Sequence, residues 1–256
     1  MNKLDKVFAN GKAFIPFITV GDPSLEITER LVLKMAEAGA DLIELGIPFS
    51  DPIAEGPVIQ AADNRALLAA TTTDKIFAMV RRIRETCDIP LALMTYVNPI
   101  FTYGTERFMN NCQEADISAV IVPDVPFEEK EELKPFCSKY NVTLISMIAP
   151  TSQNRIRMIA SEAEGFMYCV SSMGVTGVRQ EIGSGVEDMI RLVKEVKDIP
   201  CAIGFGISTP EQAAKMAGIS DGVIVGSAIV KLVEQYGLDC VPPVTEYVRK
   251  MREAIK

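Results

Sequence analysis

Two glutamates, Glu44 and Glu55, have sequence settings in which a carboxyl group can do acid or base chemistry. Glu44 lies in the apolar run 41–47, and Glu55 lies in the polar turn that follows. Side chains of a strand alternate between two faces, so Glu44 shares with Leu42 a face on which the pattern favours a core residue. Burial raises the pKa of a carboxyl group and makes it a proton donor near neutral pH. The alternative is a structural acid paired with a Lys or Arg of a neighbouring strand, and this residue alone does not separate the two.

The composition limits which other chemistry is available. The chain contains no histidine, which excludes imidazole bases, His-based triads and His metal ligands, and we expect no metal site. Any chemistry therefore depends on carboxylates, hydroxyls or the backbone. The formal net charge of -8 and the pI near 4.8 argue against nucleic acid or an anionic membrane as a partner, because binding either needs a basic face.

Length and cysteine usage predict an ordinary globular protein of the cytoplasm. With 256 residues, of which 48% are hydrophobic and 23% charged, the chain can bury a large core. Its six cysteines include no Cys-x-x-Cys pair, which indicates reduced, buried thiols. We find neither a signal-peptide core nor an apolar run long enough to cross a membrane, so we expect a cytoplasmic protein.

Apolar runs alternate with helical patterns along the whole chain. A short helix is expected at 3–10, and two successive helices, 57–70 and 74–86, follow the second strand. Short strands that are apolar on both faces and separated by helices are typical of a parallel sheet covered by helices. The expected strands are 13–20, 41–47, 91–96, 119–122, 142–148, 166–170, 201–205 and 222–225.

Eight such strand-helix units in about 250 residues predict an α/β fold of the (β/α)₈ type, a TIM barrel. We expect one domain over residues 1–256, with a short N-terminal helix and an extra helix after strand 2. The alternative is an open doubly wound sheet, which would normally show fewer units or a break in composition. In a barrel, the loops after the strands form the active face.

Two glycine-containing turns after the last two expected strands predict an anion site. The segments 204–208, GFGIS, and 226–227, GS, each precede a helix start, where free N–H groups and the helix dipole attract a phosphate. The alternative is that the glycines only make tight turns and the serines only cap helices. The long Gly- and Ser-rich loop 171–185 is expected to close over this side of the substrate, with Thr176 touching the chemistry.

Motifs spread over essentially the whole chain resemble one family, the alpha subunit of tryptophan synthase. They are PFITVGDP, IELGIPFSDPIAEGPVIQ, MTYVNP, PDVPFEE, GVTG, GFGIS and VGSAIV. The resemblance implies a (β/α)₈ lyase that cleaves indole-3-glycerol phosphate to indole and glyceraldehyde 3-phosphate. It also implies a tryptophan synthase beta subunit as partner in an α₂β₂ complex. Pyridoxal phosphate would belong to that partner, with no cofactor in this chain, and indole would pass between the subunits through a tunnel.

The resemblance also implies roles for individual residues. Glu44 matches the catalytic acid, which protonates the ring carbon that loses its side chain. Glu55 stands where the family pattern has Asp, the acid that holds the indole ring nitrogen, so its carboxylate is displaced by one methylene. The other implied positions are Tyr96 and Thr176 beside the substrate, Phe17 and Leu93 in the indole pocket, Gly177, Gly206, Gly226 and Ser227 on the phosphate, and Asp51 in the loop facing the partner.

Simpler interpretations of these positions stay open. Tyr96, Phe17 and Leu93 could be ordinary barrel packing, and Asp51 could organise its own turn. Two other functions also remain: an isomerase or epimerase acting on a small phosphosugar with Glu44 as base, and a non-catalytic barrel that regulates a partner. A large apolar cavity beside Glu44 would favour the lyase, because an indole needs it and a triose does not.

Overall fold

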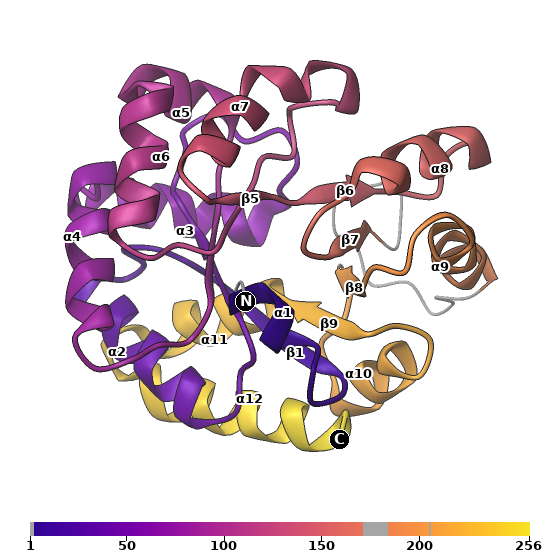
Figure 1. The fold of residues 1–256 in the computed structure, drawn as a ribbon. Coiled ribbons are helices and arrows are strands. Elements are labelled where there is room, and N and C mark those ends of the chain that lie inside the picture. The colour runs from indigo at the N-terminus through magenta and orange to yellow at the C-terminus, as the bar shows by residue number, and fades with distance from the viewer. Residues whose placement is uncertain (1–2, 171–183, 205) are drawn as a thin grey trace.

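The fold is a ring of parallel strands surrounded by helices, as seen in the computed structural model, which describes residues 3–170, 184–204 and 206–256 (Figure 1). The strands run in the order β5-β4-β3-β2-β1-β9-β8-β7-β6, and each pairing is parallel. Their bounds are β1 (Ala13–Thr19), β2 (Ile43–Gly46), β3 (Leu91–Met94), β4 (Ala119–Ile121), β5 (Thr143–Leu144), β6 (Ser146–Ile148), β7 (Met167–Val170), β8 (Cys201–Gly204) and β9 (Gly222–Val225).

The ring closes through the fifth expected strand, 142–148, which the structure divides at Ile145. Its first half, β5, pairs with β4, and its second half, β6, pairs with β7. β5 and β6 are the two terminal strands of the sheet, and Ile145 alone separates them along the chain. The N–H of Ile145 donates to the carbonyl of Val120 at 2.9 Å. β5 and β6 together are one barrel strand, so the expected (β/α)₈ barrel is confirmed.

The helices cover the outside of the ring (Figure 1). The described residues place them at α1 (Lys3–Val7), α2 (Leu25–Glu37), α3 (Pro57–Leu68), α4 (Thr73–Arg84), α5 (Val97–Tyr103), α6 (Thr105–Glu114), α7 (Lys134–Lys139), α8 (Gln153–Glu162), α9 (Ser184–Val196), α10 (Pro210–Ala217), α11 (Ser227–Tyr236) and α12 (Val241–Ala254), with 3₁₀ turns η1 (Phe127–Glu132) and η2 (Gly237–Asp239). The short leading helix and the extra helix after the second strand are both present. α5 and α12 were not expected.

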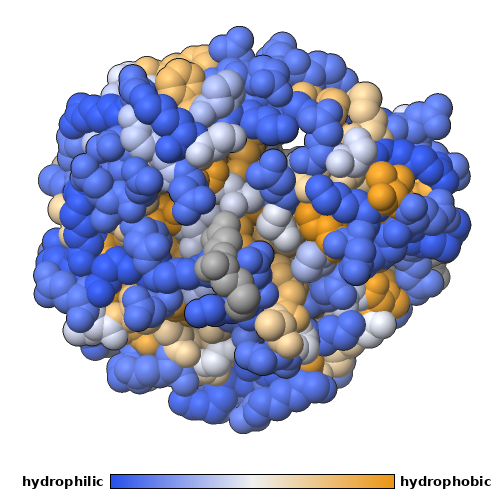
Figure 2. All heavy atoms as spheres, viewed as in Figure 1, coloured by the Kyte–Doolittle hydropathy of each residue, from blue (hydrophilic) through white to orange (hydrophobic). Residues whose placement is uncertain are grey.

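The barrel has an inner and an outer apolar layer because successive strand residues point to opposite sides. On β1, Ala13, Ile15 and Phe17 belong to the inner layer, and Phe14 and Ile18 pack in the outer layer beneath the helices. α1 closes the end of the ring where the strands begin, since its buried Leu4 and Val7 belong to the inner layer. On the face shown in Figure 2, hydrophilic residues cover most of the surface and hydrophobic residues appear in separate patches.

Candidate active site

Glu44 is a fully buried acid on the inner face of β2. Its exposed fraction is 0%, and neither carboxyl oxygen has a hydrogen-bond partner. The strand register places it between Phe17 of β1 and Ala92 of β3. Burial raises the pKa of Glu44 from 4.5 to about 8, and no Lys or Arg in the described part of the chain opposes this. The structure therefore does not support the alternative of a structural ion pair, and it leaves Glu44 protonated at neutral pH.

Glu44 and Glu55 both line one cavity of about 360 Å³ near the carboxyl ends of the strands. Beside Glu44 the wall is apolar and aromatic, and it includes Phe17, Met94 and Tyr168. Burial and the neighbouring Glu44 both raise the pKa of the Tyr168 hydroxyl, so this phenol also stays neutral. A neutral acid thus faces an apolar wall in a space suited to a flat aromatic ring.

Two glycines allow the aromatic side chains to pack into this wall. A Cβ atom added to Gly46 would lie 2.5 Å from Cζ of Phe17, and one added to Gly204 would lie 2.7 Å from the Tyr168 ring. Contacts below about 3 Å do not occur between carbon atoms in packed interiors, so any side chain at these positions would displace the rings. The shape of the cavity therefore depends on glycine at the ends of β2 and β8.

Glu55 is held by the loop between β2 and α3. The Tyr96 hydroxyl accepts a hydrogen bond of 3.0 Å from the N–H of Ala54, one residue before Glu55. Pro57 opens α3 immediately afterwards, where its missing N–H is no loss. Tyr96 is 2% exposed and does not line the cavity, so the structure places it behind the loop rather than beside the substrate space.

The Glu55 carboxyl has a second carboxyl as its neighbour. Burial raises the pKa of Glu55, and a hydrogen bond to Asp63 on α3 opposes that rise. Asp63 is 3% exposed, and sequence reasoning missed it. The sequence offered one signal for it: Asp63 is an acid within the helical pattern of α3, at a position that the structure shows to be buried.

Glycine and hydroxyl groups also line this cavity. They are Gly206, Gly226 and Ser227, which were predicted to bind phosphate, together with Ser208. No side chain caps the start of α11 at Gly226, so this helix end remains suited to an anion.

Lys231, on the same helix, also lines the cavity and was not predicted. It forms no ion pair with any residue that the structure describes. Its spacing of four from Ser227 places both on one helix face and was the signal that could have identified it.

Other predicted positions lie elsewhere. Leu93 belongs to the outer core layer, and its neighbour Met94 lines the cavity instead, so that prediction is corrected by one residue. The reason is the alternation of β3, in which Ala92 and Met94 point into the ring. Asp51 is exposed and accepts a hydrogen bond from the Ser50 hydroxyl. Thr176 and Gly177, like most of the predicted loop 171–185, lie outside the described residues.

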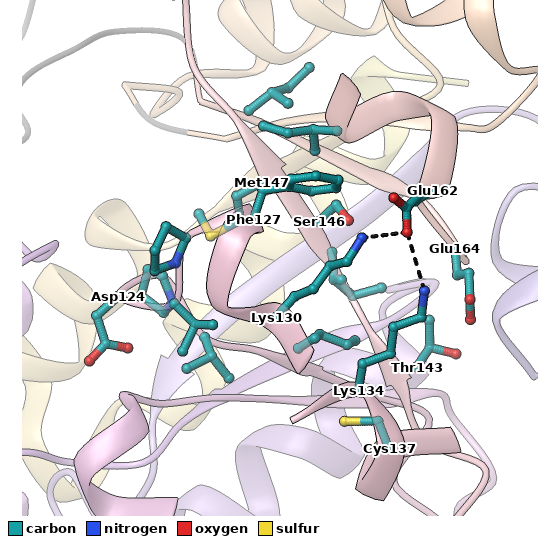
Figure 3. A pocket seen from close by; sticks show the side chains of 18 of the residues that line it. Asp124, Phe127, Lys130, Lys134, Cys137, Thr143, Ser146, Met147, Glu162 and Glu164 are labelled. Atoms are coloured by element: carbon teal, nitrogen blue, oxygen red, sulfur yellow. Dashed lines mark hydrogen bonds and ion pairs between the residues drawn. The ribbon is translucent and has the colours of Figure 1, made fainter. Parts of the chain in front are cut away.

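A larger cavity of about 750 Å³ lies along the split fifth strand, between η1, α7 and α8 (Figure 3). Lys130 and Lys134 both reach Glu162 there, as the dashed lines of Figure 3 show, and Arg155 pairs with Glu128 at 2.6 Å. None of the predicted site residues that the structure describes lines this cavity. None of the acids that line it is buried as Glu44 is, so the smaller cavity with Glu44 and Glu55 is the candidate active site.

Among the described residues, no group of His, Cys, Asp and Glu side chains could hold a metal ion. Within the same ranges, no helix is long and apolar enough to cross a membrane. The six cysteines are free thiols, five of them buried and Cys87 half-buried.

Comparison with known proteins gives a consistent result. The family model described as tryptophan synthase alpha chain matches residues 4–256. The tryptophan synthase alpha chain of Lacticaseibacillus casei is 46% identical over 255 residues, covering 100% of this chain and 96% of the relative. The crystal structure of tryptophan synthase alpha chain from Legionella pneumophila subsp. pneumophila superposes with a TM-score of 0.89 at 36% identity, covering 100% of this chain and 97% of that one. A tryptophan synthase complex from Pyrococcus furiosus gives a TM-score of 0.86 at 31% identity, covering 94% and 98%.

Proposed function

Because this chain belongs to the tryptophan synthase alpha chain family, we propose that Glu44 and Glu55 carry out its lyase reaction. That reaction is the cleavage of indole-3-glycerol phosphate to indole and glyceraldehyde 3-phosphate in tryptophan biosynthesis. The observation that carries the assignment is the fully buried, unpartnered Glu44 facing an apolar cavity that it shares with Glu55.

The two carboxyls divide the proton chemistry. Protonated Glu44 gives its proton to the ring carbon that bears the glycerol phosphate chain, and positive charge develops on the ring nitrogen. Glu55 accepts a hydrogen bond from that nitrogen and stabilises the charge. The bond from the ring to the side chain then breaks, its electron pair restores the indole, and the adjacent hydroxyl becomes an aldehyde. The hydroxyl proton returns to the Glu44 carboxylate and regenerates the acid.

The rest of the cavity positions the substrate. Phe17, Met94 and Tyr168 face the indole ring, and Gly206, Gly226 and Ser227 bind the phosphate with Lys231 as the nearby cation. Tyr96 acts on the substrate only through the Glu55 loop. Thr176 and Gly177 stay predictions from the family resemblance. A phosphosugar isomerase would have no use for the large apolar wall, so the cavity favours the lyase over that alternative.

We also propose that this chain works with a tryptophan synthase beta subunit in an α₂β₂ complex in the cytoplasm. The related Pyrococcus furiosus protein is described as a tryptophan synthase complex. In this chain, exposed Asp51 and Ile53, the latter 75% exposed, lie in the loop that carries Glu55, where a partner could sense or close the cavity. Pyridoxal phosphate would be held by that partner, and indole would pass to it through a tunnel.

Residues 1–256 are proposed to act as one TIM-barrel domain. The support is the pairing of β1 with β9, which joins strands from opposite ends of the sequence in one ring. Neither half of the chain can close the ring without the other.

The test of the function is indole release by the purified chain from indole-3-glycerol phosphate, followed by indole absorbance or a colour reaction. We expect slow release by the chain alone and faster release after addition of a beta subunit. Turnover of a small phosphosugar without indole formation would favour the isomerase, and binding without any turnover would favour the regulatory barrel.

A further inference from the structure

Arg65 of α3 joins three elements of the barrel through one guanidinium group. Its Nε and Nη2 atoms donate to the two carboxylate oxygens of Asp22 at 2.8 and 2.9 Å, and its Nη1 atom donates to Oε1 of Glu234 at 3.0 Å. Asp22 lies in the loop after β1, and Glu234 lies on α11. A forked arginine–carboxylate pair fixes the direction of both groups as well as their distance.

The two helices connected in this way both contribute to the candidate active site. Residues 54–59, which include Glu55 and the beginning of α3, line the cavity, and so do Ser227 and Lys231 of α11. Ser227, Lys231 and Glu234 are spaced by four and three residues, so they lie on one face of α11. The position of α3 relative to α11 therefore sets the distance between Glu55 and the residues proposed to bind the phosphate.

Hydrogen bonds pass any movement of α3 to Glu55. The backbone carbonyl of Glu55 accepts a bond of 2.7 Å from the side chain of Gln60 in α3. The carbonyl of Gly56 accepts from the N–H groups of Ile59 and Gln60, both at 3.1 Å. The backbone at Glu55 and the first turn of the helix are thus bonded into one unit.

Apolar packing contributes little to holding α3 on the barrel. Its buried residues are mostly small or polar: Ile59, Ala62, Asp63 and Ala66. A buried alanine removes much less apolar surface from water than a buried leucine or isoleucine does. The Asp22 carboxylate, in contrast, is 3% exposed, and a charge buried to this extent needs a well-placed opposite charge. Arg65 provides that charge and so fixes where α3 lies.

We propose that Arg65 is a positioning residue that sets the spacing between Glu55 and the phosphate-binding residues. The substrate carries an indole ring and a phosphate at its two ends, so both ends fit only when α3 and α11 keep this spacing. The proposal rests on the lyase function proposed above. Arg65 does not line the cavity, so it acts only through the elements that it joins.

Arg65→Lys tests this role. Lysine keeps a positive charge beside Asp22, but its single ammonium group cannot form the fork to Asp22 and also reach Glu234. Binding of intact indole-3-glycerol phosphate is measured by calorimetry in a Glu44→Gln background, in which the substrate is not cleaved. We expect its Kd to rise by about 10-fold, because a linked ligand gains from two sites only when their spacing matches it.

Two half-ligands separate positioning from general damage to the cavity. Indole and glycerol 3-phosphate each carry one end of the substrate, so their binding does not depend on the spacing. In Arg65→Lys their Kd values, measured by NMR titration, should change by less than about two-fold. Half-ligand binding that weakens as much as substrate binding would overturn the proposal, and so would an unchanged Kd for the substrate.

The matched control is Arg82→Lys. Arg82 of α4 donates to Glu29 of α2 through Nε at 2.9 Å and Nη2 at 2.8 Å, so the same change breaks a similar bridge between two helices. Among the described residues, those that line the cavity include none from α2 or α4. We expect unchanged Kd values for all three ligands. A rise in substrate Kd equal to that of Arg65→Lys would show that the effect is not specific to Arg65.

Glu234→Ala gives a readout even if Arg65→Lys does not fold, because it leaves the buried pair with Asp22 intact. Glu234 is about half exposed, so losing its bond to Arg65 should raise the substrate Kd by only about two- to five-fold. In the Arg65→Lys background the same change should cause no further rise, since the bond is already absent. An unchanged Kd in Glu234→Ala alone, or losses that multiply in the double variant, would contradict the bridge.

Indole release tests the proposed function separately. With Glu44 in place, Arg65→Lys should lower kcat/KM by about 10- to 100-fold, as misplacement of a catalytic group does. A wild type that binds the substrate more tightly than either half-ligand but never releases indole would refute the lyase function. It would leave the positioning role of Arg65 in binding open to the Kd comparison, which decides it without any turnover.

Discussion

Replacing Glu44 with Gln tests the role of the buried acid in both catalysis and stability. The amide keeps the size of the side chain but has no acidic proton. Because general acid catalysis contributes about 10²- to 10⁴-fold, we expect kcat for indole release to fall by at least that range. Substrate binding depends on the apolar wall and the phosphate end, so KM should stay within about two-fold.

The same substitution should stabilise the folded chain at neutral and alkaline pH. The pKa of Glu44 rises from 4.5 to about 8 on folding, so the folded state holds this proton more tightly than the unfolded state. The wild type therefore loses free energy of unfolding as the pH rises from 4.5 to about 8. Each pKa unit corresponds to about 1.4 kcal/mol, so the loss approaches about 5 kcal/mol above pH 8. Gln does not ionise, so the free energy of unfolding of Glu44→Gln does not fall in this way as the pH rises.

Urea unfolding of both proteins at pH 4.5 and pH 8 measures this difference. The two chains should differ little at the lower pH, where Glu44 is neutral in the folded state and only half ionised in the unfolded state. At pH 8, Glu44→Gln should be more stable by several kcal/mol. If Glu44→Gln were more stable than the wild type by the same free energy of unfolding at both pH values, Glu44 would not be a buried, unpaired acid. Substantial residual turnover by Glu44→Gln would refute its catalytic role.

Three further substitutions test the rest of the cavity. Glu55→Gln removes the charge that stabilises the ring nitrogen, so kcat should fall by about 10²- to 10³-fold in steady-state assays while the fold is kept. Lys231→Met should raise KM by about five-fold with kcat unchanged, as loss of a partly exposed phosphate contact would, and an unchanged KM would remove Lys231 from the site. Gly46→Ala should push the Phe17 ring into the cavity, raising KM and lowering stability by about 1 to 3 kcal/mol by thermal unfolding. The matched control is Gly185→Ala, where an added Cβ meets nothing within 4 Å, and stability should be unchanged or slightly higher.

Strand-helix alternation was enough to predict the barrel, because a two-sided apolar strand between helices has few other ways to be buried. The pattern did not show where the ring closes. Residues 142–148 form a continuous β-rich run, and only the pairing of each half with a different neighbour divides it at Ile145. Residues 127–139 are likewise divided, into η1 and α7, with Pro135 in the first turn of the second helix.

Within the site, the sequence identified which acid is buried but not what surrounds it. The shift from Leu93 to Met94 is a one-residue error in strand alternation, and the apolar run contains no polar residue that would fix the facing side. Asp63 could not be identified as a neighbour of the Glu55 carboxyl because that proximity depends on how α3 lies against the preceding loop. The expected helix 74–86 begins one residue earlier, at Thr73, because the hydroxyl of Thr72 caps α4 by accepting from the N–H of Lys75.

Cleavage of a substrate whose indole ring lies in the cavity of Glu44 and Glu55 can be tested directly by one measurement. Indole and glyceraldehyde 3-phosphate should be quantified together after the purified chain is incubated with indole-3-glycerol phosphate. We predict that the two products form in equal amounts and that Glu44→Gln forms neither at a measurable rate. The account would be contradicted if Glu44→Gln formed the products in the same amounts as the wild type. It would also be contradicted if the wild type formed no products with a beta subunit present.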